Sequence, residues 1–195
     1  MNKFLNKTVS LLSLLAAIYS TAASAQWQLN TADSALNIVA SKNTHISEVF
    51  MIKRLQGEIS ESGALSINLD LSSIDTGIGI RDERMQAHLF EVDKHPSATI
   101  TTQLETSVLD QLKKGGFMQV SLTASVDLHG VKKDIPMVLN VMSTGNKLLV
   151  SARKPLLINS ETFGLSGGLT KLAELAGGIS ISQTATVNFS LVFDN

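Results

Sequence analysis

Residues 120–128 read Val-Ser-Leu-Thr-Ala-Ser-Val-Asp-Leu, and this stretch decides the fold class. Apolar side chains stand at every second position, and small polar or acidic side chains stand between them. Because successive side chains of a β-strand point to opposite faces, the stretch predicts a strand with one apolar and one polar face. Residues 65–71 and 187–193 repeat this alternation. A fold that buries one face of several strands is therefore expected.

Weaker alternation marks further strand candidates at 27–40, 46–59, 97–106, 135–143 and 147–158. With the three clear stretches they make about eight strands in one domain, and the absence of regular strand-helix alternation favours an antiparallel sheet. Closing that sheet removes exposed edges and gives the apolar faces one shared interior. The sequence therefore predicts an all-β fold, a closed antiparallel β-barrel of about eight strands with one or two short helices.

Two segments depart from the strand pattern and predict the helices. Residues 81–91 carry closely spaced charges, with Met85 and Leu89 four positions apart, a spacing that places side chains on one helical face. Residues 169–175 place leucines three apart before Gly177-Gly178, which is typical of a helix end. This second helix is expected to serve either as core packing or as a lid over an opening of the barrel.

The first 25 residues have the pattern of a secretory signal peptide. Lys3 and Lys7 give a positive start, residues 9–18 are mostly apolar, and Ala23-Ser24-Ala25 matches a cleavage site. The apolar run is shorter than the roughly 20 residues that a membrane span needs, although an uncleaved anchor is the alternative. We expect removal of residues 1–25, export to the periplasm and one mature domain at residues 26–195.

Composition narrows the function classes. The chain has 16 Lys+Arg against 17 Asp+Glu, too balanced for a phosphate-binding surface, so nucleic acid is not an expected partner. Cysteine is absent from the sequence, which excludes disulfides, thiolate nucleophiles and cysteine-ligated metals. A membrane-spanning barrel would carry aromatic girdles, yet the chain has one Trp, and its single tyrosine, Tyr19, lies in the expected leader. A barrel that is not membrane-spanning, with its apolar face inward, is therefore expected.

Motifs of familiar chemistry are incomplete. Residues 164–168 match Gly-x-Ser-x-Gly, but a nucleophile elbow needs an α/β sheet and a later histidine, and the last histidine is His129. Gly77-Ile78-Gly79 lacks the third glycine of a dinucleotide fingerprint and is interpreted as a turn. A potential metal-ligand set without recognised spacing consists of His88, Glu91, Asp93 and His95. The sequence thus predicts no catalytic residue, no metal site and no cofactor.

One series of motifs is more specific. It begins with Ser-Ile-Asp-Thr at 73–76 and continues with Arg81-Asp82, Leu-Phe-Glu-Val at 89–92 and His95-Pro96. This series resembles the YceI-like family of exported polyisoprenoid-binding proteins. Further pieces arrive in the family's order, and they are Trp27 with Ser34, a turn at 128–133 and Phe163-Gly164-Leu165. The resemblance covers nearly all of residues 26–195.

The resemblance implies a lipocalin-like barrel whose long apolar lumen holds an isoprenoid chain or a similar lipid. An aliphatic lumen suits such a ligand, because burying each CH₂ contributes roughly 0.8 kcal/mol without a directional partner. Phe90 and Phe163 are the expected lumen contacts. Arg81 is placed to meet a head group at the mouth, with Asp82 orienting it through a charge-assisted hydrogen bond. Alternatively, Arg81 and Asp82 form a structural pair that fixes the helical connection.

Three positions depart from the family pattern. Asn30 stands in place of an Asp, Asp33 in place of a His, and Ser160 in place of an Arg. These changes remove a positive charge and a titratable ring from the regions expected near the opening strand and the barrel end. Head-group preference is therefore the property that transfers least well from the family.

The leading hypothesis is a periplasmic carrier or reservoir for a polyisoprenoid or other long-chain lipid, and not an enzyme. A second hypothesis is a filled structural module that binds an envelope protein, or assists stress tolerance, through its outer surface. A third and less favoured one is a β-barrel enzyme acting on an apolar substrate, for which the sequence offers no cluster of titratable groups. The oligomeric state is open, with a homodimer among the options.

Overall fold

The computed structural model describes residues 25–195, so the expected leader lies outside the described residues except for Ala25. The strands are β1 (Ala25–Leu29), β2 (Ala35–Lys42), β3 (Ile46–Ile52), β4 (Leu55–Ser60), β5 (Ala64–Asp70), β6 (Ile74–Asp75), β7 (Ser97–Gln103), β8 (Gly116–Leu128), β9 (Val131–Ser143), β10 (Lys147–Ala152), β11 (Leu156–Asn159) and β12 (Thr184–Asp194). The helices are α1 (Gly79–Arg84), α2 (Thr106–Lys114) and α3 (Ser166–Leu175), with a π-helical segment η2 (Met85–Phe90) and short 3₁₀ turns η1 (Leu71–Ser73) and η3 (Glu161–Phe163).

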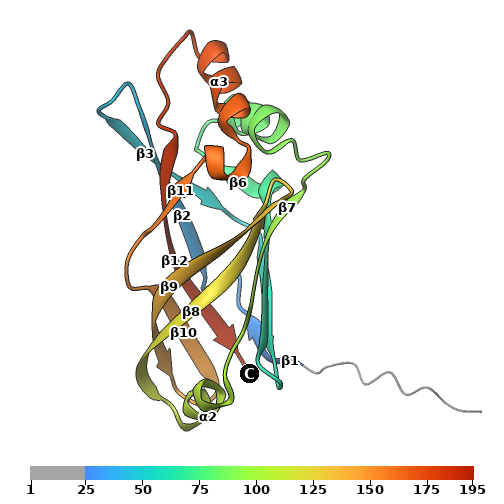
Figure 1. Cartoon of the computed structure of the whole chain (residues 1–195), viewed down its shortest axis with the longest axis vertical. Coiled ribbons are helices and arrows are strands. Elements are labelled where there is room, and N and C mark those ends of the chain that lie inside the picture. The colour runs from blue at the N-terminus through green and yellow to red at the C-terminus, as the bar shows by residue number, and fades with distance from the viewer. Residues whose placement is uncertain (1–24) are drawn as a thin grey trace, which may run out of the picture.

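Eight of the strands close into a barrel, in the order β1-β4-β5-β7-β8-β9-β10-β12. Pairing of β12 with β1 completes the ring, and every strand pair in it is antiparallel. The remaining strands extend the wall beyond the ring, because β2, β3 and β6 continue from one edge of β12 and β11 pairs with the other edge. The predicted closed antiparallel barrel is confirmed (Figure 1).

The long hairpin of β8 and β9 contains the stretch that decided the fold class. Its pairs run without interruption from Gly116 opposite Ser143 to Leu128 opposite Val131. His129 and Gly130 form the two-residue turn, with φ angles of 56° and 74°. Positive φ at both positions is the geometry of a type I′ turn, whose twist matches that of the flanking strands. The turn expected within residues 128–133 is therefore present.

Three of the expected strands are each divided in two by the structure. The stretch 27–40 contains β1 and β2, 46–59 contains β3 and β4, and 147–158 contains β10 and β11. At the first break the Ser34 hydroxyl donates to the Asn30 carbonyl oxygen at 2.7 Å and accepts from the Val192 N–H at 2.9 Å. A side chain thus takes the place of a backbone partner, which lets the strand bend while the ladder with β12 continues.

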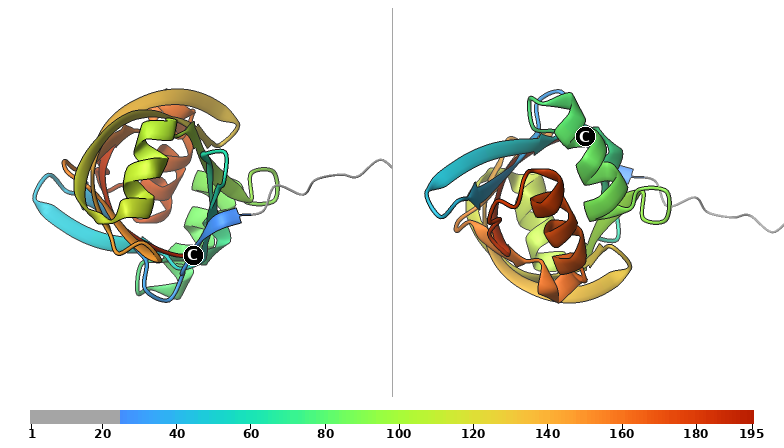
Figure 2. Two further views of the ribbon diagram at one scale, coloured as in Figure 1. Left: turned by 90° about the horizontal axis from the view of Figure 1, so that it is seen from below. Right: turned by 90° about the horizontal axis from the view of Figure 1, so that it is seen from above.

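The helices cover the two ends of the barrel. Figure 1 shows α2 at the lower end and α3 at the upper end. Viewed from above in Figure 2, α3 and the consecutive segments α1 and η2 lie across the upper opening. The expected helix at 81–91 corresponds to α1 with η2, and the one at 169–175 to α3, which begins three residues earlier. No helix in the described part of the chain is long and apolar enough to cross a membrane.

The third helix, α2, was not predicted, so the expected number of one or two helices was too low. It buries Leu109 and Leu112 against the lower end of the barrel. The Ser143 hydroxyl donates to the Leu112 carbonyl oxygen at 2.5 Å and so ties the helix to β9. Its sequence signal was present: apolar residues at 108, 109 and 112, followed by Gly115-Gly116 as a stop.

Candidate ligand-binding site

A cavity of about 490 Å³ lies inside the upper part of the barrel. Its volume falls within the roughly 300–1,000 Å³ of typical small-molecule sites. Leu122, Ala124 and Val126 of β8 line it, and the cross-strand partners of the first two, Met137 and Ile135 of β9, line it as well. The apolar face that the alternation in 120–128 predicted is therefore the wall of a hollow interior.

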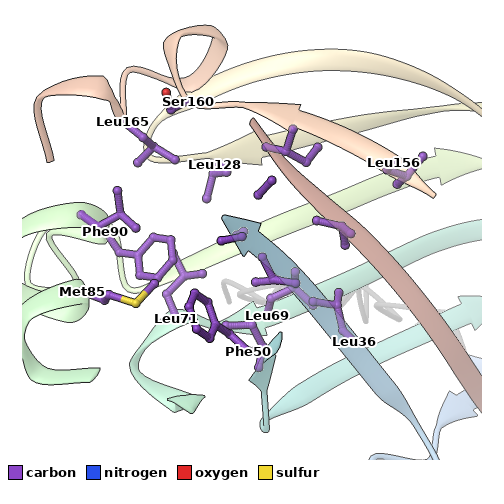
Figure 3. A pocket seen from close by; sticks show the side chains of 18 of the residues that line it. Leu36, Phe50, Leu69, Leu71, Met85, Phe90, Leu128, Leu156, Ser160 and Leu165 are labelled. Carbon is purple, nitrogen blue, oxygen red and sulfur yellow. The ribbon is translucent and has the colours of Figure 1, made fainter. Parts of the chain in front are cut away.

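The cavity wall is mainly aliphatic. Leucine, isoleucine, valine and alanine dominate the lining, and its aromatic side chains are all phenylalanines. In Figure 3 the side chains of Phe50, Phe90 and Met85 converge on the space from one side, and Leu128 and Leu165 face it from the other. Such a wall offers dispersion contacts along most of its length and few hydrogen-bond partners, which suits a long hydrocarbon chain.

Charged groups gather at one end of the cavity. Lys42, Glu48 and Arg81 all border it. The Glu48 carboxylate accepts from Arg81 Nη1 at 2.6 Å through one oxygen and from Lys42 Nζ at 3.1 Å through the other. Burial raises the pKa of Glu48, but the hydrogen bond from Lys42 and the positive charge of Arg81 outweigh that effect, so this pKa lies below its ordinary value.

Arg81 has several contacts besides Glu48. Its Nη2 donates to the Thr76 carbonyl oxygen at 2.7 Å, and its guanidinium carbon lies 4.9 Å from the centre of the Phe50 ring, within cation-π range. Its Nε is buried and has no hydrogen-bond partner among the described residues. Arg81 therefore borders the polar end of an otherwise apolar cavity with its guanidinium held by Glu48 and Thr76.

Asp82 does not bond to Arg81 in the structure. Its carboxylate accepts from the Thr76 N–H at 2.9 Å and from the Thr76 hydroxyl at 2.5 Å. The expected direct orientation of Arg81 by Asp82 is thus replaced by an indirect link, since both side chains hold Thr76. Neighbouring residues on a helix point in different directions, so a direct contact between the two was sterically unfavourable.

The two expected phenylalanine contacts lie in different surroundings. Phe90, at the end of η2, lines the cavity, whereas Phe163 is 1% exposed, packs in the core and is not part of the cavity wall. Of the four predicted ligand-binding residues, the structure therefore brings Arg81 and Phe90 to the cavity and places Asp82 and Phe163 behind its wall. Their roles in binding stay predictions.

The three departures from the family pattern are also separated. Ser160 lines the cavity, and its hydroxyl bonds to Gln183 and lies 3.1 Å from the Ser166 hydroxyl. Asn30 donates to Asp194 at 2.8 Å, and Asp33 pairs with Lys147 at 3.4 Å. These two residues therefore lie at the lower end with the C-terminal residues of β12, away from the cavity. Of the three, Ser160 alone is placed to affect a ligand.

The residues considered for metal binding and for nucleophilic catalysis have other partners. Glu91 accepts from Lys94 at 2.6 Å and lies 3.1 Å from His129 Nε2. Within residues 25–195, no three His, Asp or Glu side chains are grouped to hold a metal ion. Ser166 has the Ser160 hydroxyl, and no histidine, as its hydrogen-bond partner.

Sequence reasoning missed Glu48 and Phe50 as members of the site. The signal that could have found them is the run Ile-Ser-Glu-Val-Phe-Met-Ile at 46–52, in which Glu48 is the one charged residue. A charge that shares a strand face with Phe50 and Ile52 must find a partner inside the fold. That partner, Arg81, stands 33 positions away in the sequence.

Comparison with known proteins gives one family and several related folds. A model of the YceI-like domain matches residues 27–193. The structure of a polyisoprenoid binding domain from Saccharophagus degradans, implicated in plant cell wall breakdown, is 35% identical, covers 88% of this chain and 99% of its own, and superposes with a TM-score of 0.84. BcnA of Burkholderia cenocepacia, at 16% identity, covers 84% of this chain and 98% of its own with a TM-score of 0.64, which shows the fold alone. No curated protein sequence matches the chain.

Proposed function

This chain belongs to the YceI-like family, as its motifs predicted, and from that premise we propose that it binds a polyisoprenoid or similar long-chain lipid in the barrel cavity. The observation that carries the proposal is the cavity of about 490 Å³ with an aliphatic wall and one polar end. Each buried CH₂ of a prenyl chain contributes roughly 0.8 kcal/mol there, without any directional partner. A related domain, that of Saccharophagus degradans, is described as polyisoprenoid binding.

We further propose that the protein stores or carries this lipid in the periplasm. The support is the signal-peptide pattern of residues 1–25, with its positive start, apolar run and Ala-Ser-Ala site. A hydrocarbon chain of this kind is insoluble in water, so moving it between two membranes needs a binding protein that shields it. The proposal is of a binding protein, and no step of chemistry on the ligand is assigned to it.

Within the site, we propose that Arg81 contacts the head group and Phe90 the chain. The Arg81 side chain is 23% exposed, and its guanidinium offers N–H donors and a positive charge to a hydroxyl, carbonyl or phosphate oxygen of the ligand. Asp82 acts indirectly, because it accepts a hydrogen bond from Thr76, and the carbonyl oxygen of Thr76 accepts one from Arg81. Phe163 supports the fold near this end without lining the cavity.

The experiment is native mass spectrometry of protein purified without delipidation, followed by solvent extraction of the bound material. The expected result is a co-purified prenyl lipid and, after its removal, saturable uptake of a polyprenol. A protein that carries no lipid and takes up no polyprenol would contradict the proposal.

A matched pair of variants locates the binding in the cavity. Ala124→Phe fills space from β8, where Ala124 is 1% exposed and lines the wall, and Ser121→Phe places the same ring outside on the same strand. Polyprenol binding should weaken at least about tenfold in the first variant, and it should be unchanged in the second. Thermal unfolding of both variants checks that each is folded, and equal affinities in two folded variants would count against the cavity.

A further inference from the structure

The cavity reaches solvent at its upper end. Nearly all of its lining side chains are buried or half-buried, and the exposed apolar ones all lie at this end. Ile78 is 49% exposed and Ile80 is 55% exposed, although both also line the cavity, and Ala176 does the same from the far side. These residues therefore form a rim on which the apolar interior continues onto the outer surface.

One side of the rim is the segment 76–80, Thr-Gly-Ile-Gly-Ile, which carries no charge. A Cβ added at Gly77 or at Gly79 would meet no atom within 4 Å, so the backbone at these two glycines faces open space. Gly77 has a φ of 74°, the left-handed conformation that turns the chain outward at little cost for glycine. We call this segment the first tip.

The other side of the rim is the segment 175–179, Leu-Ala-Gly-Gly-Ile, which is likewise uncharged. Leu175 is 36% exposed, and Cβ atoms added at Gly177 and Gly178 would again meet no atom within 4 Å. Arg84 of α1 donates to the Leu175 carbonyl oxygen at 3.1 Å and so ties this second tip to the helix that follows the first. Both tips therefore border one opening, although 94 residues lie between them in sequence.

The two uncharged apolar tips form an exposed apolar surface beside the mouth of an apolar cavity. Clustered exposed apolar side chains mark an interaction site, and the absence of charge from both tips means that they can enter a hydrocarbon phase without desolvating an ion. From this arrangement we infer that the two tips dock on a lipid surface and seat the cavity mouth against it. A lipid chain then passes between bilayer and cavity without crossing water. This last step rests on the proposed function, whereas docking itself does not.

The protein offers a matched control for this surface. Phe117 and Met142 are cross-strand partners on β8 and β9, are 57% and 47% exposed, and lie near α2 at the closed end of the barrel. They are therefore as apolar and as exposed as Ile78 and Ile80, but they border no cavity mouth. If exposure alone caused membrane affinity, both pairs would contribute to it.

The experiment compares the double variants Ile78→Ser/Ile80→Ser and Phe117→Ser/Met142→Ser with the parent protein, each purified as the host cell processes it. Serine suits position 78, because this residue is the N-cap of α1 and has no side-chain cap hydrogen bond. Flotation with phosphatidylcholine vesicles measures docking, and uptake of a polyprenol from detergent micelles measures ligand binding. We expect the rim variant to lose about tenfold in vesicle partitioning and the control variant to lose nothing.

Equal partitioning of the two variants, or no partitioning of the parent, would overturn the inference. Uptake from detergent should be the same in the parent and the control variant. Ile78 and Ile80 also line the cavity, so uptake by the rim variant is measured only as the baseline for its transfer from vesicles, and flotation of the ligand-free proteins decides docking. If none of them takes up polyprenol, the proposed function fails, but the flotation result still decides whether the tips dock. Transfer of polyprenol from vesicles to the rim variant should slow by a similar factor of about ten, which links docking to loading.

Discussion

The two ends of the barrel are built from the same alternating strands, yet one is solid and the other is hollow. At the lower end, large side chains meet in the middle, and Trp27 and Leu148 are at most 1% exposed. At the upper end the corresponding inward positions include small residues that line the cavity, namely Ala40, Ala98, Ala124 and Ala185. The comparison teaches that inward side-chain volume, and not strand pattern, decides where a barrel of this size holds a ligand.

The two ends of the barrel also differ in how their strands are paired. The lower ring is a continuous ladder closed by β1 and β12, and α2 covers its end. In the upper part no strand pair closes the ring, because the extension of the sheet from β12 ends at β6, and the helices α1 and α3 complete the enclosure. Elements with fewer paired backbone groups open locally more easily, so the end that holds the cavity is also the end suited to admit a ligand.

The largest expected effect is a loss of stability when a buried side chain of the solid end is shortened. Leu148→Ala should lower the free energy of unfolding by about 3–4 kcal/mol, because the side chain is 0% exposed and its removal leaves a new void. Leu139→Ala on the adjacent strand should cost clearly less, since Leu139 already borders the cavity and loses fewer contacts. Urea denaturation of both ligand-free variants measures the difference. Equal losses would show that the two ends are packed alike.

A second prediction concerns the upper cover and uses two adjacent glycines of α3. A Cβ at Gly168 would lie 2.4 Å from the His88 carbonyl oxygen, so Gly168→Ala must push α3 away from η2 and should cost about 1–3 kcal/mol. A Cβ at Gly167 would meet no atom within 4 Å, so Gly167→Ala should instead stabilise the helix by up to about 1 kcal/mol. Thermal unfolding should show a lower melting temperature for Gly168→Ala and a higher one for Gly167→Ala.

Hydrogen exchange then tells where the loss in Gly168→Ala occurs. Faster exchange of amides in α3 and η2, with unchanged exchange in the lower ring, would sharpen the contrast between the two ends. Uniformly faster exchange would mean that the barrel and its cover unfold as one unit.

A third prediction tests the loop that supports Arg81. Asp82→Ala removes both hydrogen bonds to Thr76, a residue that is 9% exposed, and should cost about 1–2 kcal/mol. Glu83→Ala on the same helix is the control, because Glu83 is exposed and its loss should change stability by less than about 0.5 kcal/mol. Urea denaturation measures the free energy of unfolding of both variants. Equal small losses would show that Asp82 does not stabilise the loop that holds Arg81.

The smallest expected effect is a pH dependence at the mouth. The pKa of Glu48 is lowered in the folded protein, so its ionised form stabilises the fold above the ordinary glutamate pKa of about 4.3, and this contribution is lost as the pH falls through the lower folded-state pKa. Glu48→Gln should therefore be less stable than the parent by about 0.5–1 kcal/mol near neutral pH. Denaturation at a series of pH values should show this difference shrink in acid, and a difference that grew in acid would contradict the assignment.

Much of the fold was predictable because it rests on local rules. The alternation in 120–128 predicts β8, and the turn at His129-Gly130 follows from residues that tolerate positive φ. The breaks within 27–40 and 46–59 were not predictable, because each depends on a partner strand elsewhere, as when Ser34 bonds to Val192. Of the predicted site residues, Arg81 and Phe90 border the cavity, and their roles in binding stay predictions. Glu48 was missed, since its importance lies in a contact with a distant helix.

By itself, then, the sequence determined which side chains share a strand face, that those strands close into an antiparallel barrel, and that the motifs are those of the YceI-like family. Periodicity and turn chemistry act between near neighbours, so they can be read along the chain. Only the tertiary structure decided that the upper half is hollow, that Arg81 pairs with Glu48, and that two uncharged tips meet at the mouth. Those properties depend on which side-chain volumes and charges face one another across the barrel. Residues that face one another there can be far apart in the sequence, so their contacts cannot be read along the chain.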